Sequence, residues 1–110
     1  MSRREVIVSG PVDEVLIDCM EQCSLGRMSR QDYDGIRTWF GRVVEDLAER
    51  FDDFGSVEEW NSDPINGVIG RARPHEPLTD RYGAEVGASL DVSSQRVTVT
   101  WFTIIRRRAV

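Results

Sequence analysis

Apolar and polar residues alternate along the first half of the C-terminal stretch 96–105, and this pattern predicts a β-strand. Val97, Val99 and Trp101 share one face, and the positions between them are threonines. From residue 102 to residue 105 the alternation is lost, which indicates burial on both faces and therefore a central place in a sheet. We expect the core of the protein to be built around this strand.

Apolar residues at intervals of three and four predict two helices in the first half of the chain. The first helix begins at Pro11, which suits the first turn of a helix, and its apolar stripe continues to Cys23. The second has Ser29 as its N-cap and a longer apolar stripe that includes Trp39. Because Trp39 and Trp101 each lie on the apolar face of their element, we expect both indoles to be buried in one core.

Three shorter segments complete the pattern of elements. Residues 6–8 are β-branched and predict a first strand, residues 68–73 predict another, and residues 81–91 alternate in polarity and predict a third. With the C-terminal strand, the order becomes β-α-α-β-β-β. This order is typical of a two-layer α+β fold in which a small antiparallel sheet packs on two helices. The length fits one α+β domain that spans residues 1–110.

Charge is distributed unevenly along the chain, whose formal net charge is −5. Residues 1–63 hold 15 acidic side chains against 7 arginines, whereas residues 64–110 hold 4 against 7. All 14 basic residues are arginines, because the sequence contains no lysine. Reactions that need a lysine Schiff base or a phosphate-loop lysine are therefore excluded.

The apolar runs of the sequence are short. None approaches the roughly 18 residues that a membrane-spanning helix requires, so we expect no membrane partner. The apolar run at residues 6–8 is also too short for the central region of a signal peptide. We therefore expect a soluble protein of the cytoplasm.

The stretch from residue 52 to residue 67 has no regular period and combines carboxylates with aromatic side chains. Ser56 and Glu59 have the spacing of a capping box, which predicts one helical turn that carries Trp60. Carboxylates around an exposed aromatic residue are typical of a surface that binds a basic protein partner, since charges steer the partner and the ring anchors it. The predicted partner-binding residues are Asp52, Asp53, Phe54, Glu58, Glu59 and Trp60. The alternative is a solvated acidic loop with Trp60 packed on the core.

Two cysteines and one histidine are the residues that suggest metal or catalytic chemistry. Cys19 and Cys23 share a helix face, but zinc takes four ligands and His75 is the only histidine. We expect both cysteines to be reduced and to pack as small apolar residues, with no metal and no cofactor. His75 lies between two prolines and is interpreted either as a general acid/base or as a solvated loop residue.

Three arginines, Arg106, Arg107 and Arg108, directly follow the apolar C-terminal strand. Such a cluster binds phosphates or carboxylates, or it remains solvated and discourages aggregation of the strand. The acidic charge of the whole chain argues against nucleic acid as the main ligand.

Two classes of function are compatible with these features. The acidic half favours a non-enzymatic protein-binding module or inhibitor, of the kind represented by small immunity proteins, antitoxins and phage-encoded inhibitors. The second class is an enzyme, because the order of elements, ending in a strand followed by basic residues, resembles the RelE/ParE toxin architecture. That resemblance implies a ribonuclease or another RNA-binding domain. The residues to test for it are Arg73, His75, Arg81, Tyr82 and Arg106. The oligomeric state is left open, a homodimer included.

Overall fold

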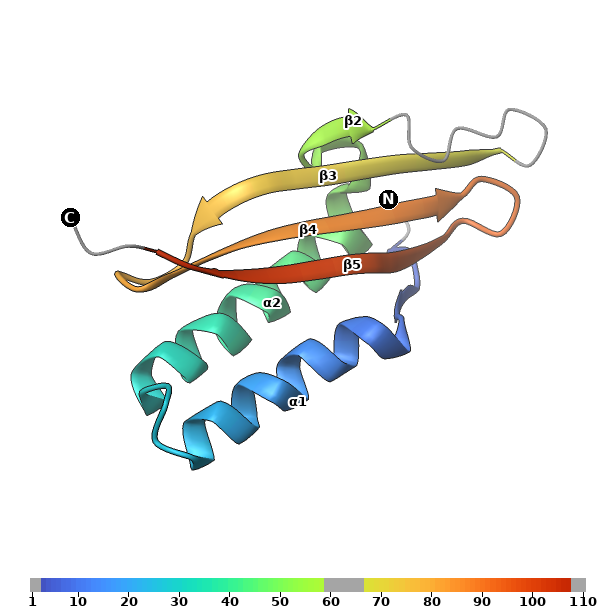
Figure 1. Ribbon diagram of the computed structural model, residues 1–110. Helices are drawn as coiled ribbons and strands as arrows, with labels where there is room; N and C mark the ends of the chain where they lie inside the picture. The colour runs from blue at the N-terminus through green and yellow to red at the C-terminus, as the bar shows by residue number, and fades with distance from the viewer. Residues whose placement is uncertain (1–2, 59–66, 108–110) are drawn as a thin grey trace.

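The computed structural model describes residues 3–58 and 67–107, apart from the side chains of residues 56–58. These residues form a sheet of five strands, and both helices lie on one face of it (Figure 1). The elements are β1 (Val6–Val8), α1 (Gly10–Ser24), α2 (Arg30–Arg50), the 3-10 turn η1 (Phe51–Asp53), β2 (Ser56–Glu58), β3 (Val68–Pro77), β4 (Tyr82–Asp91) and β5 (Arg96–Arg106).

The sheet has the strand order β1-β5-β4-β3-β2. Neighbouring strands from β5 to β2 are antiparallel, whereas β1 runs parallel to β5, with Val6 opposite Val97. The predicted α+β fold, a small sheet packed on two helices, is therefore confirmed, but the sheet is mixed and not wholly antiparallel. A parallel pair needs a long connection, and the helices and the other strands supply it between β1 and β5.

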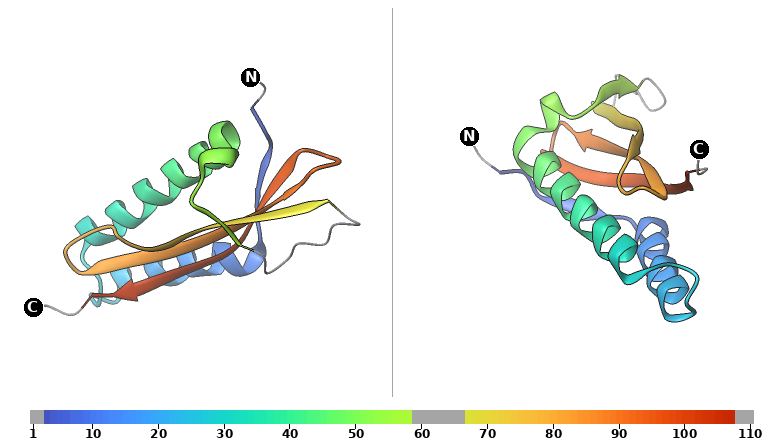
Figure 2. Two further views of the ribbon diagram at one scale, coloured as in Figure 1. Left: turned by 90° about the horizontal axis from the view of Figure 1, so that it is seen from above. Right: turned by 90° about the vertical axis from the view of Figure 1, so that its left-hand side faces the viewer.

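The helices form an antiparallel pair beneath the sheet, with α1 under β5 (Figure 2). The Ser29 side chain caps α2 by accepting a hydrogen bond from the backbone amide of Asp32 at 3.1 Å. Gly26, with φ +75°, lets the chain reverse between the helices in a backbone conformation that other residues rarely adopt. Within the described part of the chain, neither helix combines the length and the apolar character that a membrane span requires.

A β-bulge interrupts the pairing of β5 with β4. Gly87 lies opposite Trp101 and Ala88 lies opposite Val99, so Thr100 is an extra residue on β5. The extra residue moves the side chains that follow to the other face, so Phe102 joins Val99 on the helix side. The prediction that Trp101 is buried with Trp39 in one core is wrong for this reason. The bulge, and not burial on both faces, also accounts for the lost alternation.

The indole of Trp101 lies instead on the open face, which is the face of the sheet opposite the helices. A side chain at Gly87 would collide with the indole ring, so the ring lies against this glycine. The Thr100 hydroxyl donates a hydrogen bond to the Gly87 carbonyl at 3.2 Å, which links the bulge to β4. Trp101 remains half-buried because of this contact with the sheet.

Phe102 is the centre of the contact between helices and sheet. Its ring lies 4.9 Å from that of Phe40, edge to face, and 5.8 Å from the stacked ring of Trp39. Phe102 is 4% exposed, and Trp39 packs against the core while remaining partly exposed. The largest fully buried side chains of this core are Phe51, Phe54, Ile36, Leu47, Val12, Val43, Val86, Val97 and Val99.

The segment after α2 differs from the sequence prediction. The helical turn predicted from Ser56 and Glu59 is not formed, since residues 56–58 are the extended strand β2, paired with β3. Pairing with a long neighbour satisfies the backbone of these residues better than an isolated helical turn would. Strand β3 is longer than predicted and continues to Pro77 across an irregularity between Arg73 and Glu76.

We expect the substitution Phe102→Ala to lower the free energy of unfolding by about 3 to 5 kcal/mol, because it leaves a cavity between helices and sheet. Trp101→Ala removes a larger side chain, but from the open face, so it is expected to cost less than half as much. Urea denaturation of both variants at one protein concentration measures the difference. A larger loss for Trp101→Ala would contradict the assignment of faces on β5.

Candidate functional site

The predicted partner-binding residues separate into three groups in the structure. Asp52 and Asp53 lie in η1 with exposed side chains, as expected for residues that meet a partner. Phe54 is 1% exposed, so its ring is part of the core and is not available as an anchor. The Glu58 side chain, and Glu59 and Trp60 entirely, lie outside the described residues.

Phe54 is buried because the chain after η1 turns back onto β3. The Arg73 guanidinium lies over the Phe54 ring, 4.3 Å from its centroid. The next residue, Gly55, has φ +60°, and a side chain there would collide with the Ala72 carbonyl. A glycine directly after an aromatic residue was the available signal for this close approach, although it gave no hint of which strand lies nearby.

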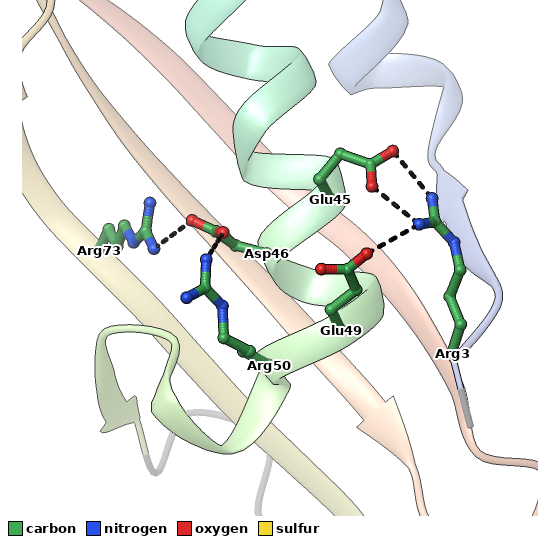
Figure 3. A network of polar contacts seen from close by, with 6 residues as sticks. All are labelled: Arg3, Glu45, Asp46, Glu49, Arg50 and Arg73. Carbon is green, nitrogen blue, oxygen red and sulfur yellow. Dashed lines mark hydrogen bonds and ion pairs between the residues drawn. The ribbon is translucent and has the colours of Figure 1, made fainter. Parts of the chain in front are cut away.

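The carboxylates near the end of α2 are paired with arginines (Figure 3). Arg3 bonds both carboxylate oxygens of Glu45 at 2.8 Å and one oxygen of Glu49 at 3.1 Å. Asp46 accepts hydrogen bonds from Arg50 at 2.7 Å and from Arg73 at 2.9 Å. The acidic charge at this end of α2 is therefore largely neutralised within the molecule.

The ion pairs of Asp46 are more buried than those of Arg3, and 24% of the Asp46 side chain is exposed. Partial burial by itself raises the pKa of Asp46, but the hydrogen bonds and charges of Arg73 and Arg50 together outweigh it. The pKa of Asp46 therefore lies below that of an ordinary aspartate. Asp46 links the helix layer to β3 through its charged form.

Helix α1 carries unpaired negative charge. Its acidic residues are Asp13, Glu14, Asp18 and Glu21, and the helix contains no arginine. All four are exposed, and none forms an ion pair with another residue that the structure describes. Two apolar side chains are exposed among them, Ile17 at 50% and Met20 at 49%. This surface was not predicted from the sequence, although the position of Ile17 off the apolar stripe of the helix was a signal for it.

A groove of about 840 Å³ separates α1 from the second half of β5. Its lining residues are Pro11, Glu14, Val15, Asp18, Cys19, Gln22, Arg27, Met28, Tyr82, Phe102, Thr103, Ile104 and Arg106. The groove therefore has apolar and aromatic side chains in its lining and charges of both signs, carboxylates on α1 and guanidinium groups at Arg27 and Arg106. Such a lining suits a peptide or protein segment more than a small charged substrate.

Both cysteines are free thiols, as the sequence predicts. Cys19 is buried, and this burial, followed by the negative charge of Asp18, raises the pKa of its thiol. Cys23 is half-buried on the same side of α1. Among the residues that the structure describes, no three histidine, cysteine or carboxylate side chains gather into a possible metal site.

The five residues proposed for an enzyme do not converge on one site. Tyr82 and Arg106 lie opposite each other on β4 and β5 and both line the groove. Arg73 is bound to Asp46 on the helix side of β3, and the His75 ring lies against Gly83. Arg81 is exposed in the turn before β4. The structure thus brings together two of the five.

Comparison of the chain with protein-family models, with curated proteins and with solved structures gave no significant match.

We expect Asp46→Asn to lower the free energy of unfolding at neutral pH by about 1 to 2 kcal/mol, because two charge-assisted hydrogen bonds are weakened. The folded-state pKa of Asp46 is depressed, so its contribution is present above the ordinary carboxyl pKa of about 4 and is lost as the pH falls through the folded pKa. Thermal or urea unfolding between acid and neutral pH measures this difference.

Asp34→Asn is the matched control for that measurement. Asp34 forms an ion pair with Arg30 at 3.1 Å, but both side chains are more than half exposed. Its replacement is expected to cost at most about 0.5 kcal/mol. Equal losses for the two variants, or a loss for Asp46→Asn that does not shrink in acid, would contradict the proposed link to β3.

Proposed function

We propose that the protein is a non-enzymatic binding module of the inhibitor type, which docks a partner with a basic surface through its acidic half. The observation that carries this proposal is the surface of α1, where carboxylates without an ion-pair partner among the described residues flank the exposed side chains of Ile17 and Met20. Asp13, Ile17, Met20 and Glu21 form this outer α1 surface.

The outer α1 surface has the composition of a docking site. Exposed apolar side chains within a charged rim favour association, since burial of the apolar atoms stabilises a complex. The carboxylates of Asp13 and Glu21 add a long-range attraction for a basic partner, which raises the rate of association. On α2, by contrast, Arg3, Arg50 and Arg73 already bind the nearby carboxylates.

The exposed residues Asp52 and Asp53 support the same proposal. Asp52 and Asp53 follow the end of α2, and α1 begins at this same end of the antiparallel helix pair. Asp52 lies 4.0 Å from Arg4 with 77% of its side chain exposed, so this ion pair neutralises it only weakly. Both aspartates therefore extend the negative potential toward an approaching basic partner. The free cysteines are consistent with action in the reducing cytoplasm.

The proposal is tested by measuring the rates at which the chain binds and releases a partner on a surface. The partner is the protein that the natural chain captures from an extract of its source organism. The double variant Asp13→Asn/Glu21→Gln is expected to slow association on the order of threefold to tenfold and to weaken its dependence on salt. Ile17→Ala is expected to act mainly on dissociation, which becomes faster because an apolar contact is lost.

Asp52→Asn/Asp53→Asn removes the same number of charges and serves as the comparison. A smaller effect than that of the α1 pair is expected, because the aspartates extend the field without surrounding the apolar contact. Thermal unfolding shows whether each variant remains folded. If all three variants bind the captured protein as the natural chain does, the acidic half is a solvated surface and the proposal fails.

A further inference from the structure

The second part of strand β5, from Thr100 to Arg106, pairs only with β4 among the residues that the structure describes. β1 pairs with β5 only from Val97 to Val99, and the amide of Ser9 then donates a hydrogen bond to the Val99 carbonyl at 3.4 Å. Beyond this bond the chain leaves the sheet and enters α1. From Thr100 to Arg106, no strand within residues 3–58 and 67–107 pairs with the edge of β5 opposite β4.

The polar groups of this open edge are directed toward the groove beside α1. The amide of Arg107 donates to the Arg81 carbonyl at 2.7 Å, on the side of β4. Backbone groups alternate in direction along a strand, so those of Phe102 and Ile104 are directed toward the open edge. Phe102, Thr103 and Ile104 also line the groove. An unpaired edge of this kind is a template for another strand.

We propose that the open edge of β5 pairs with the same edge of a second copy of this chain. The two strands are antiparallel about a two-fold axis at Thr103, so that the two sheets become one continuous sheet. An axis at this residue uses the whole open edge from Thr100 to Arg106. A two-fold contact of this kind closes on itself and does not propagate into a fibre.

The side chains of β5 complement one another in this register. Phe102 of one copy lies opposite Ile104 of the other on the helix side. On the open face, Trp101 lies opposite Ile105, and Thr103 lies opposite Thr103. Aromatic residues opposite β-branched residues, and threonine opposite threonine, are favourable cross-strand pairs. Trp101, Ile104 and Ile105 are all half-buried in the single chain, so the pairing removes further apolar surface from water.

The charges along the groove are also self-complementary. α1 begins beside Val99 and runs in the same direction as β5 (Figure 1), so Glu14 lies toward the start of the groove and Arg106 toward its end. A two-fold axis at Thr103 places Arg106 of each copy opposite Thr100 of the other. Each guanidinium group then approaches the acidic end of the partner's groove.

This inference does not depend on the proposed function. It uses the groove side of α1 and the edge of β5, whereas the binding of a basic partner uses the outer α1 surface. If the self-association through β5 fails its test, the binding of a basic partner can still be tested by its own kinetics, and the reverse also holds.

Sedimentation of the natural chain over a dilution series tests the proposal first. The expected result is a mass of twice 12.5 kDa that falls to the single-chain value on dilution. Thr103→Arg places two like charges directly opposite each other and is expected to raise the dissociation constant by about tenfold or more. A natural chain that remains a monomer at concentrations up to about 1 mM would overturn the proposal.

Thr98→Arg is the matched control, since Thr98 lies on the same strand but between Ile7 and Ser89, where both neighbours are already present. This variant is expected to associate as the natural chain does. If Thr98→Arg and Thr103→Arg weaken the association of the chain equally, the contact between the two copies lies elsewhere and the proposed pairing of β5 is wrong.

Disulfide cross-linking tests the register of the two β5 strands. It detects the paired state directly and does not depend on a loss of association. At the two-fold axis Thr103 of each copy faces its own equivalent, so Thr103→Cys is expected to form a cross-linked dimer under mild oxidation. Thr98→Cys and the natural chain, which carries Cys19 and Cys23, are the controls and are expected to remain uncross-linked. Cross-linking of Thr98→Cys to the same extent as Thr103→Cys would refute the register.

Discussion

The packing of Phe102 between the helices and the sheet is the interaction on which the arrangement of the molecule depends, and the bulge at Thr100 makes it possible. Without the extra residue, alternation along β5 would direct Trp101 and Thr103 toward the helices after Val99. A threonine hydroxyl would then enter the core without an assured partner. With the bulge, Phe102 reaches Phe40 and Trp39, and Thr103 remains exposed beside the groove.

Electrostatics divides the helix layer into two parts with different roles. The carboxylates near the end of α2 bind arginines of distant segments, since Glu45 binds Arg3 from the N-terminal segment and Asp46 binds Arg73 from β3. The carboxylates of α1 have no such partners among the described residues, and they surround exposed apolar side chains. Charges that are not used within the molecule remain available to steer another one, which is why the proposed docking surface lies on α1.

The two proposed contacts use different sides of the same helix, and both are compatible in one assembly. Pairing through β5 would occupy the groove while the outer α1 surface, with Ile17 and Met20, stays exposed. A two-fold assembly would present two such surfaces, and a partner with two basic sites would then bind more tightly through effective concentration. The two proposed contacts would then lie on different sides of α1, the self-association on its groove side and the basic partner on its outer side.

Features that depend on residues close together in the chain follow from the amino-acid sequence alone. The start of α2 at Ser29, the clean alternation of β4 and the concentration of acidic residues in the first half all follow from local patterns. The small sheet on two helices followed from the same patterns, as did the order of all the elements except η1 and β2.

Features that depend on contacts between distant residues became evident only in the folded chain. The bulge at Thr100 exists in relation to Gly87 on β4, and the burial of Phe54 depends on Arg73 and on the close approach of Gly55 to β3. The strand that replaced the helical turn at residues 56–58 likewise required β3 as its neighbour. The preference of a short segment for helix or strand is weak. Hydrogen bonds and packing with a distant strand therefore determine its conformation, and they also determine which of its side chains remain exposed.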